Sequence, residues 1–145
     1  MELSIQTVLI NVTDLKQSIE FYQDVFDLHL TSQREEVAVL MVHETDRRQV
    51  LLLRELSGRS NHPGRRNVGL RMLSFEVGTT NGLDAIERKL AERNALIWHA
   101  QTETYKGIMG VDPDRTEIAV ASSLTGTPIT ADDWKNVDDA IYAVE

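Results

Sequence analysis

The alternation of apolar and polar positions predicts one order of elements that occurs twice along the chain. Residues 4–12 alternate as a strand does, and Asp14 is a residue type that caps helices. An apolar stripe at helical spacing follows, made of Leu15, Ile19, Tyr22 and Phe26. Three more strands are expected at Leu28–Arg34, Val37–His43 and Gln49–Glu55. The first half therefore reads βαβββ.

The second half repeats this order after a loop at 56–69 that is rich in Gly, Ser, Asn and Pro. A strand is expected at 71–77, and a helix then begins at a cap formed by Thr80 or Asn81. Its apolar stripe is Leu83, Ile86 and Leu90, and three strands follow at 96–101, 106–111 and 117–122. We expect an α+β fold of two tandem βαβββ modules, about 4–56 and 69–123, in one domain spanning 1–126. Their mixed sheet would curl around a cleft, where ligands usually bind.

Residues 127–145 form a separate acidic tail, which is expected to be helical. Thr130 and Asp133 resemble a capping box, with Asp in the place that Glu usually takes. Trp134, Val137 and Ile141 then lie on one side of a helix. The tail is expected to dock by this stripe, on its own domain or on a partner subunit.

Composition limits the classes of function. The chain of 145 residues has no cysteine, which excludes disulfides, thiolate metal sites and cysteine nucleophiles. Its net charge of -8 argues against a nucleic-acid partner, because phosphate binding needs a basic surface. No apolar run has the length of a membrane span, and the first residues lack the basic region of a signal peptide. We expect a soluble, cytoplasmic protein that does not bind membranes.

Three segments carry a family resemblance that spans about residues 5–123. In TVLINVTDLKQSIEFYQDVFDL, the residues Asp14-Leu15, Ser18 and Phe21-Tyr22 match the opening of the vicinal oxygen chelate superfamily in order and spacing. MLSFEV resembles the strand that opens that family's second module, and DPDRTEIAV resembles its closing strand. The superfamily includes glyoxalase I, extradiol dioxygenases, fosfomycin-resistance enzymes and bleomycin-resistance proteins.

The resemblance also implies where a metal would bind in members that hold one. Those positions carry histidines in the first and fifth strands and a glutamate in the last strand. Here they are Thr7, Met72 and Ala119, with the fourth-strand position near Leu51. A hydroxyl, a thioether, a methyl and an isobutyl group cannot replace imidazole and carboxylate ligands of Zn, Ni, Mn or Fe. We therefore expect no metal ligand and no cofactor.

The pocket-facing residues expected to bind a ligand are mostly apolar, with a few polar groups. They are Thr7, Leu9, Asn11, Met41, Met72, Ser74, Trp98, Met109 and Ala119. For Met41, Trp98 and Met109, the pattern does not decide which face of the sheet each side chain lies on. A lining of this kind suits a small organic molecule, although methionine and tryptophan also fill ordinary cores.

Charged groups leave alternatives open. Glu76 and Glu117 are the acids expected on the pocket face, where they would attract a cation or, in an enzyme, act as general base and acid. A rearranged metal site from His43, His99 and Glu117 is a further alternative. Arginines gather around the linker and would bind an anionic ligand, lie in solvent, or pair with the acidic tail of another subunit. They are Arg54, Arg59, Arg65, Arg66 and Arg71.

The leading hypothesis is a metal-independent protein that binds a hydrophobic or aromatic, possibly cationic, small molecule. It resembles the bleomycin-resistance branch, which implies a homodimer. The alternative is a glyoxalase- or dioxygenase-like enzyme with a non-standard metal site or a glutamate general base. A third possibility is a domain that only pairs with another protein through its acidic tail.

Overall fold

The computed structural model describes residues 1–42, 49–56 and 70–142. The chain divides into two compact units, Met1–Asn61 and His62–Glu145. The acidic tail belongs to the second unit. Each unit is described by itself below.

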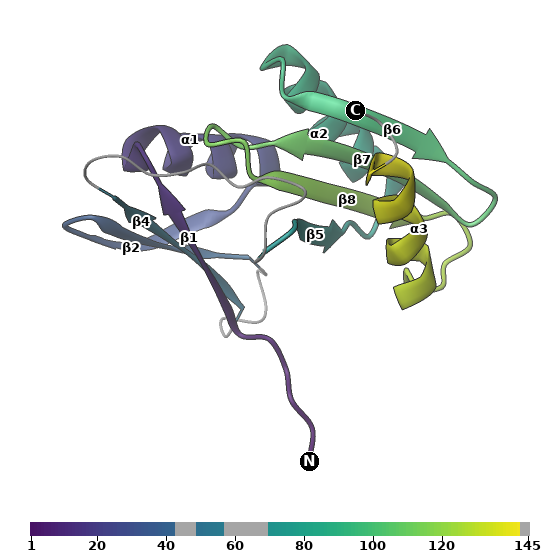
Figure 1. The fold of residues 1–145 in the computed structure, drawn as a ribbon, viewed down its shortest axis with the longest axis horizontal. Coiled ribbons are helices and arrows are strands. Elements are labelled where there is room, and N and C mark those ends of the chain that lie inside the picture. Colours follow the sequence, from purple (N-terminus) through teal and green to yellow (C-terminus); the bar gives the residue numbers. More distant parts are fainter. Residues whose placement is uncertain (43–48, 57–69, 143–145) are drawn as a thin grey trace. The chain divides into compact units, whose positions relative to one another are not determined.

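The first unit is a four-stranded sheet with one helix, and its elements follow the predicted βαβββ order (Figure 1). They are β1 (Thr7–Val12), α1 (Leu15–Phe26), β2 (His29–Arg34), β3 (Val37–Met41) and β4 (Val50–Glu55). The strand order is β1-β4-β3-β2, with β1 and β4 parallel and the other neighbours antiparallel. The predicted end of β3 at His43 lies outside the described residues.

Helix α1 begins where the sequence predicts. The Asp14 carboxylate accepts a hydrogen bond of 3.1 Å from the backbone N–H of Gln17. The N–H of Leu15, another free donor of the first turn, binds Glu55 Oε1 at 3.0 Å. The helix buries its apolar stripe against the sheet face that carries the buried residues Ile10, Val12, Ala38, Leu40, Leu51 and Leu53. The core of this unit therefore lies between α1 and β1, β3 and β4.

The second unit repeats the order and adds a third helix. Its elements are β5 (Leu73–Glu76), α2 (Thr80–Glu92), β6 (Leu96–Gln101), β7 (Tyr105–Val111), β8 (Glu117–Ser123) and α3 (Ala131–Tyr142). The strand order β5-β8-β7-β6 is equivalent to that of the first sheet, again with one parallel pair. The prediction of an α+β fold with two βαβββ modules is confirmed. The strands form two separate four-stranded sheets rather than one continuous sheet.

Helix α2 is capped one residue earlier than predicted. The hydroxyl of Thr79, rather than the side chain of Thr80 or Asn81, accepts a hydrogen bond of 3.0 Å from the N–H of Gly82. Leu83 and Leu90 are fully buried, and α2 contacts β6, β7 and β8. Among the described residues, no helix has the length and apolar character needed to cross a membrane.

Candidate ligand-binding face

The ligand residues predicted in the second module lie on one face of its sheet. Strand register places Ser74 beside Ala119, Ala119 beside Met109, and Met109 beside Trp98. Directly paired residues point to the same side of a sheet, so these four form a row across β5, β8, β7 and β6. Met72, just before β5, packs against the same group. The facing of Trp98 and Met109, which the sequence left open, is thereby fixed.

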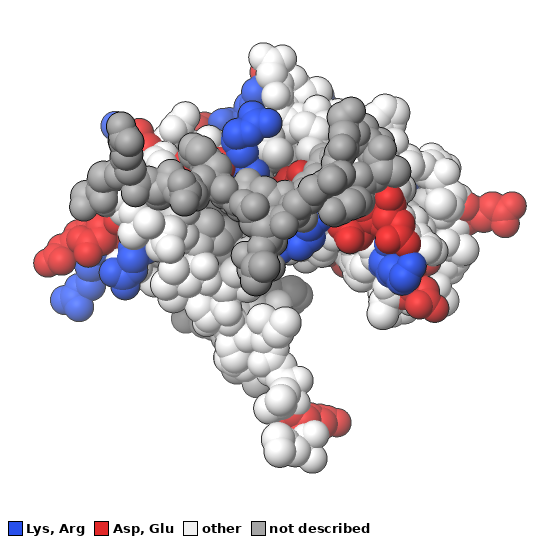
Figure 2. Space-filling view, in the orientation of Figure 1, with Lys and Arg blue, Asp and Glu red and all other residues white. Residues whose placement is uncertain are grey.

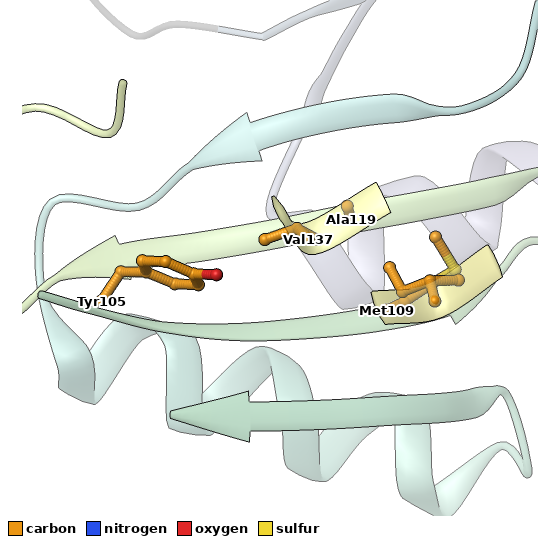
Figure 3. Packing of buried hydrophobic residues seen from close by; sticks show 5 residues of the cluster. Tyr105, Met109, Ala119 and Val137 are labelled. Carbon is orange, nitrogen blue, oxygen red and sulfur yellow. The ribbon is translucent and has the colours of Figure 1, made fainter. Parts of the chain in front are cut away.

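Helix α3 covers this face. Val137 and Ile141 are 1% and 0% exposed and form one buried cluster with Tyr105, Met109 and Ala119. Figure 3 shows Val137 on α3 beside Ala119 on β8, with Tyr105 and Met109 on β7. Met72, Trp98, Ile129 and Trp134 pack around this cluster. The tail therefore docks on its own unit by the predicted stripe, and β8 is buried on both sides.

Two sets of hydrogen bonds fix the start of α3. Thr130 N–H donates to Asp133 Oδ2 and Asp133 N–H donates to the Thr130 hydroxyl, both at 3.0 Å, which confirms the predicted capping box. The N–H of Ile129 donates to Glu76 Oε1 at 2.7 Å. Glu76 is therefore already engaged by the segment that leads into the helix.

An ion-pair bridge connects α3 to the sheet. The guanidinium of Arg71, two residues before β5, donates from Nη1 to Glu117 on β8. Its Nη2 lies 3.1 Å from Asp138 Oδ1 on α3. The side chains of Arg71 and Glu117 are 21% and 14% exposed, so this bridge is partly shielded from solvent. Figure 2 shows acidic side chains gathered over α3, with a basic side chain among them.

Tyr105 reports on the polarity beneath α3. Burial raises the pKa of the Tyr105 phenol above its ordinary value, and the nearby Asp133 carboxylate raises this pKa further. Both causes disfavour the phenolate. The environment under the first turn of α3 is therefore apolar and slightly negative.

The first unit presents a comparable face on the side of its sheet opposite α1. Thr7, Leu9 and Asn11 share this face, and register places Val50 beside Thr7 and Met41 beside Val50. Thr7 and Asn11 are exposed, and Leu9 is 45% exposed. Thr7, Leu9, Asn11 and Met41 therefore lie on the sheet face opposite α1, and their role in binding a ligand stays a prediction.

Leu51, near which the resemblance puts the fourth-strand position, does not share a face with Thr7. Leu51 is 2% exposed and lies with Leu53 on the face that α1 covers. The residues of β4 that share a face with Thr7 are Val50 and Leu52, which pair across the strands with Thr7 and Leu9. Val50 and Leu52 are both apolar, so neither can act as a metal ligand.

The structure does not bring Glu76 and Glu117 together as an acid–base pair. Glu76 pairs with Ala121, four residues beyond Glu117 on β8, a separation of roughly 13 Å along a strand. Glu117 binds Arg71, and Glu76 binds Ile129. The two carboxylates are too far apart to share a proton.

The rearranged metal site is not assembled either. His99 pairs with Ile108 and lies on the face opposite Met109 and Trp98, whereas Glu117 lies on the same face as Ala119. His43 lies outside the described residues. Within the described ranges, no group of three His, Asp or Glu side chains is placed to hold a metal ion.

Of the linker arginines, two lie in the described residues. Arg54 is 3.8 Å from Glu36 in an exposed pair. Arg71 makes the contact with the acidic tail that the sequence suggested, but within one chain. Arg59, Arg65 and Arg66 lie outside the described residues. Arg71 and Asp138 were not among the predicted site residues, although the opposite charges of the linker and tail hinted at such a pair.

The side chains at the positions where the resemblance places the family's metal ligands do not fit a divalent ion. In the second unit the resemblance points to Met72 and Ala119, and the methyl of Ala119 is buried under α3. A thioether suits soft metals, and one alone makes no site. In the first unit Thr7 supplies a hydroxyl between aliphatic neighbours.

The fold and the positions of these faces define a protein of the glyoxalase-like class. A family model described as Glyoxalase/Bleomycin resistance protein/Dioxygenase superfamily matches residues 4–120. The chain belongs to this superfamily, as its residues suggested. A search of curated protein sequences found no match.

Solved structures share the fold at low sequence identity. A glyoxylase/bleomycin resistance protein/dioxygenase domain from Frankia sp. EAN1pec superposes with a TM-score of 0.75 at 20% identity, covering 88% of this chain and 96% of that one. The fosfomycin resistance protein FosX from Listeria monocytogenes gives 0.66 at 11% identity, covering 86% and 97%. Lactoylglutathione lyase from Agrobacterium tumefaciens gives 0.60 at 18%, covering 82% and 92%. These similarities establish the fold.

Proposed function

We propose that this protein is a metal-independent binder of a hydrophobic or aromatic small molecule. The observation that carries the proposal is the row formed by Ser74, Ala119, Met109 and Trp98. It places a methyl group, a thioether and an indole next to one another, with a single hydroxyl beside them. Helix α3 covers Met109 and Ala119. Once the helix is displaced, such a lining suits an apolar ligand that is oriented by few polar contacts. The flexible methionine side chain adapts to ligands of irregular shape.

Metal independence is supported by the chemistry of the side chains at the expected ligand positions. Thr7, Met72 and Ala119 offer no imidazole or carboxylate. Glu117, the nearest carboxylate in sequence to Ala119, is neutralised by Arg71. A metal recruited there would have to displace a guanidinium from a partly buried pair.

The case for a cationic ligand is weakened by the partners of the two carboxylates. Glu76 and Glu117 motivated that expectation, and each already binds a group of the protein itself. The ligand class is therefore left as hydrophobic or aromatic.

The test is the metal content of protein purified without a histidine tag and then offered Zn, Mn, Ni and Fe. We expect less than about a tenth of an equivalent per chain and no change in the melting temperature after EDTA. Apolar and aromatic compounds are then screened by melting shift, since a ligand of the native state raises the melting temperature. One tightly held metal equivalent, or a large drop in the melting temperature with EDTA, would contradict the proposal.

A homodimer in the cytoplasm completes the proposal. The dimer is supported by the resemblance to the bleomycin-resistance branch, and the location by a chain without cysteines. Sedimentation velocity tests the dimer, and a single species of monomer mass at micromolar concentration would exclude it.

A further inference from the structure

Arg71 lies at the edge of the candidate ligand-binding face and forms ion pairs with two carboxylates. Glu117 belongs to the sheet, whereas Asp138 belongs to the helix that covers the face. Among the described residues, removing α3 would leave Arg71 with one partner instead of two. The apolar row of Ala119, Met109 and Trp98 would then be uncovered, with Arg71 and Glu117 at its edge.

The contact between Arg71 and Asp138 is electrostatic rather than a directed hydrogen bond. Their atoms are 3.1 Å apart, but Arg71 Nη2 and Asp138 Oδ1 are both buried without a hydrogen-bond partner among the described residues. Arg71 Nε is in the same condition. A guanidinium has five N–H donors and binds carboxylates best through two parallel hydrogen bonds. Arg71 therefore has N–H groups at Nε and Nη2 that can donate hydrogen bonds to an anion whose oxygens are better aligned than those of Asp138.

Helix α3 presents to this face the two chemical features that such an anion would have. Val137 and Ile141 supply the apolar part, and Asp138, next to Val137, supplies the negative charge. We propose that α3 stands in for the ligand of this face. The ligand is an apolar molecule with one carboxylate, which takes the place of Asp138 on Arg71 and the place of the apolar stripe on Met109 and Ala119. This inference rests on the proposed function and names the class of its ligand.

Displacement of α3 breaks the apolar contacts of Val137, Ile141 and Trp134 and the ion pair of Asp138 with Arg71. The helix has twelve residues, a length at which an isolated helix is marginal in water. Among its side chains whose burial is described, the fully buried apolar ones are Val137 and Ile141. Elements held by few buried contacts open locally at a lower free energy than the whole domain. A ligand that replaces both the apolar contacts and the charge can therefore compete with the helix.

The experiment compares three probes that share one alkyl chain and differ in charge: decanoate, decanol and decyltrimethylammonium. Each is titrated by calorimetry into the full chain and into Asp138→Asn and Asp139→Asn. The two variants make the same charge change at adjacent positions of α3, but Asp138 contacts Arg71 whereas exposed Asp139 pairs with Lys135. Asp139→Asn is thus a matched control for the general loss of negative charge.

We expect decanoate to bind the full chain more tightly than the other two probes. Asp138→Asn should tighten decanoate binding at least about fivefold, because it removes a competing carboxylate from Arg71. Decanol binding should change less than decanoate binding, and Asp139→Asn should leave both close to the original. Saturating decanoate should also speed hydrogen exchange in α3. Equal effects of the two asparagine variants, or decanoate binding no tighter than decanol binding, would overturn the inference.

A double variant tests Arg71 itself. Arg71→Gln combined with Glu117→Gln removes the cation without leaving Glu117 as an unpaired, largely buried carboxylate; the Asp138 side chain, which also loses its cation, is 37% exposed. We expect it to keep decanol binding and to lose the preference for decanoate, and a retained preference would refute the role of Arg71. Binding of all three probes with equal affinity would overturn this inference and leave the proposed function standing. Failure of every probe in every variant, together with a failed melting-shift screen, would overturn both.

Discussion

Glu76 accepts a hydrogen bond of 2.7 Å from the backbone N–H of Ile129, across 53 positions of sequence. This bond ties the edge strand β5 to the segment that enters α3. Glu76, which was expected to face the pocket, therefore stabilises the start of α3. The docked tail and the candidate ligand-binding face are consequently connected, and the stability of both can be tested together.

Removal of the Glu76–Ile129 hydrogen bond should destabilise the segment that leads into α3. Glu76→Ala is expected to cost about 0.5–1.5 kcal/mol of stability and to speed hydrogen exchange at Ile129 and in α3. Glu103→Ala is the control, because Glu103 is exposed in the turn between β6 and β7 and carries the same charge. Exchange mass spectrometry measures the effect. Equal exchange rates of Ile129 in both variants would show that the bond contributes nothing.

Truncation of the α3 stripe should destabilise the second unit. Ile141 is fully buried, so Ile141→Ala is expected to cost about 2–4 kcal/mol, or less if the helix undocks first. Ile97→Ala is the matched control, because Ile97 on β6 is 39% exposed and loses the same atoms. Urea unfolding measures both variants. A cost for Ile141→Ala no greater than that for Ile97→Ala would mean that α3 does not dock by this stripe.

Two glycines of β7 should respond differently to the same substitution. A Cβ at Gly110 would lie 2.7 Å from Leu90 Cδ2 and 3.0 Å from the carbonyl oxygen of Ala95, so Gly110→Ala forces α2 away from the sheet. We expect a loss of about 1–3 kcal/mol. A Cβ at Gly107 would meet its nearest atom, on Trp98, at 3.5 Å, which is ordinary contact. Gly107→Ala should be neutral or stabilising in thermal unfolding. Similar melting temperatures for the two variants would contradict this packing.

Stability should fall at alkaline pH because of Tyr105. Its pKa is raised in the native state by burial and by Asp133, so the native protein holds the phenol proton at a pH where the unfolded chain has released it. The contribution is fully present below the unfolded value of about 10 and is lost as pH rises from there through the native pKa. Tyr105→Phe should flatten the decline in unfolding free energy above pH 9. An identical decline in both proteins would exclude this cause.

The elements themselves could be predicted because their patterns are local. The bounds of α1 and β6, the capping box of α3 and its apolar stripe all follow from residue type and period. The cap of α2 was misplaced because Thr79, Thr80 and Asn81 are all capable of capping. The fourth-strand position was placed only near Leu51 because this residue lies in a run of three leucines, in which alternation carries no information.

The candidate site depended on information that is not local. Strand register decided that Trp98 and Met109 share a face with Ala119 and that His99 does not. The sequence predicted an amphipathic tail helix and left its docking surface open. The bridge from Glu117 through Arg71 to Asp138 joins three segments distant in sequence, so no spacing rule could reveal it.

The positions of the two tryptophans give the chain a selective optical probe. Trp98 and Trp134 are its entire indole content, and both border the cluster beneath α3. Intrinsic tryptophan emission therefore reports on the second unit and is blind to direct events in the first. Circular dichroism, by contrast, averages the backbone of both. Unfolding curves that coincide by the two methods would mean that the units melt as one cooperative body, and curves that separate would measure the stability of each.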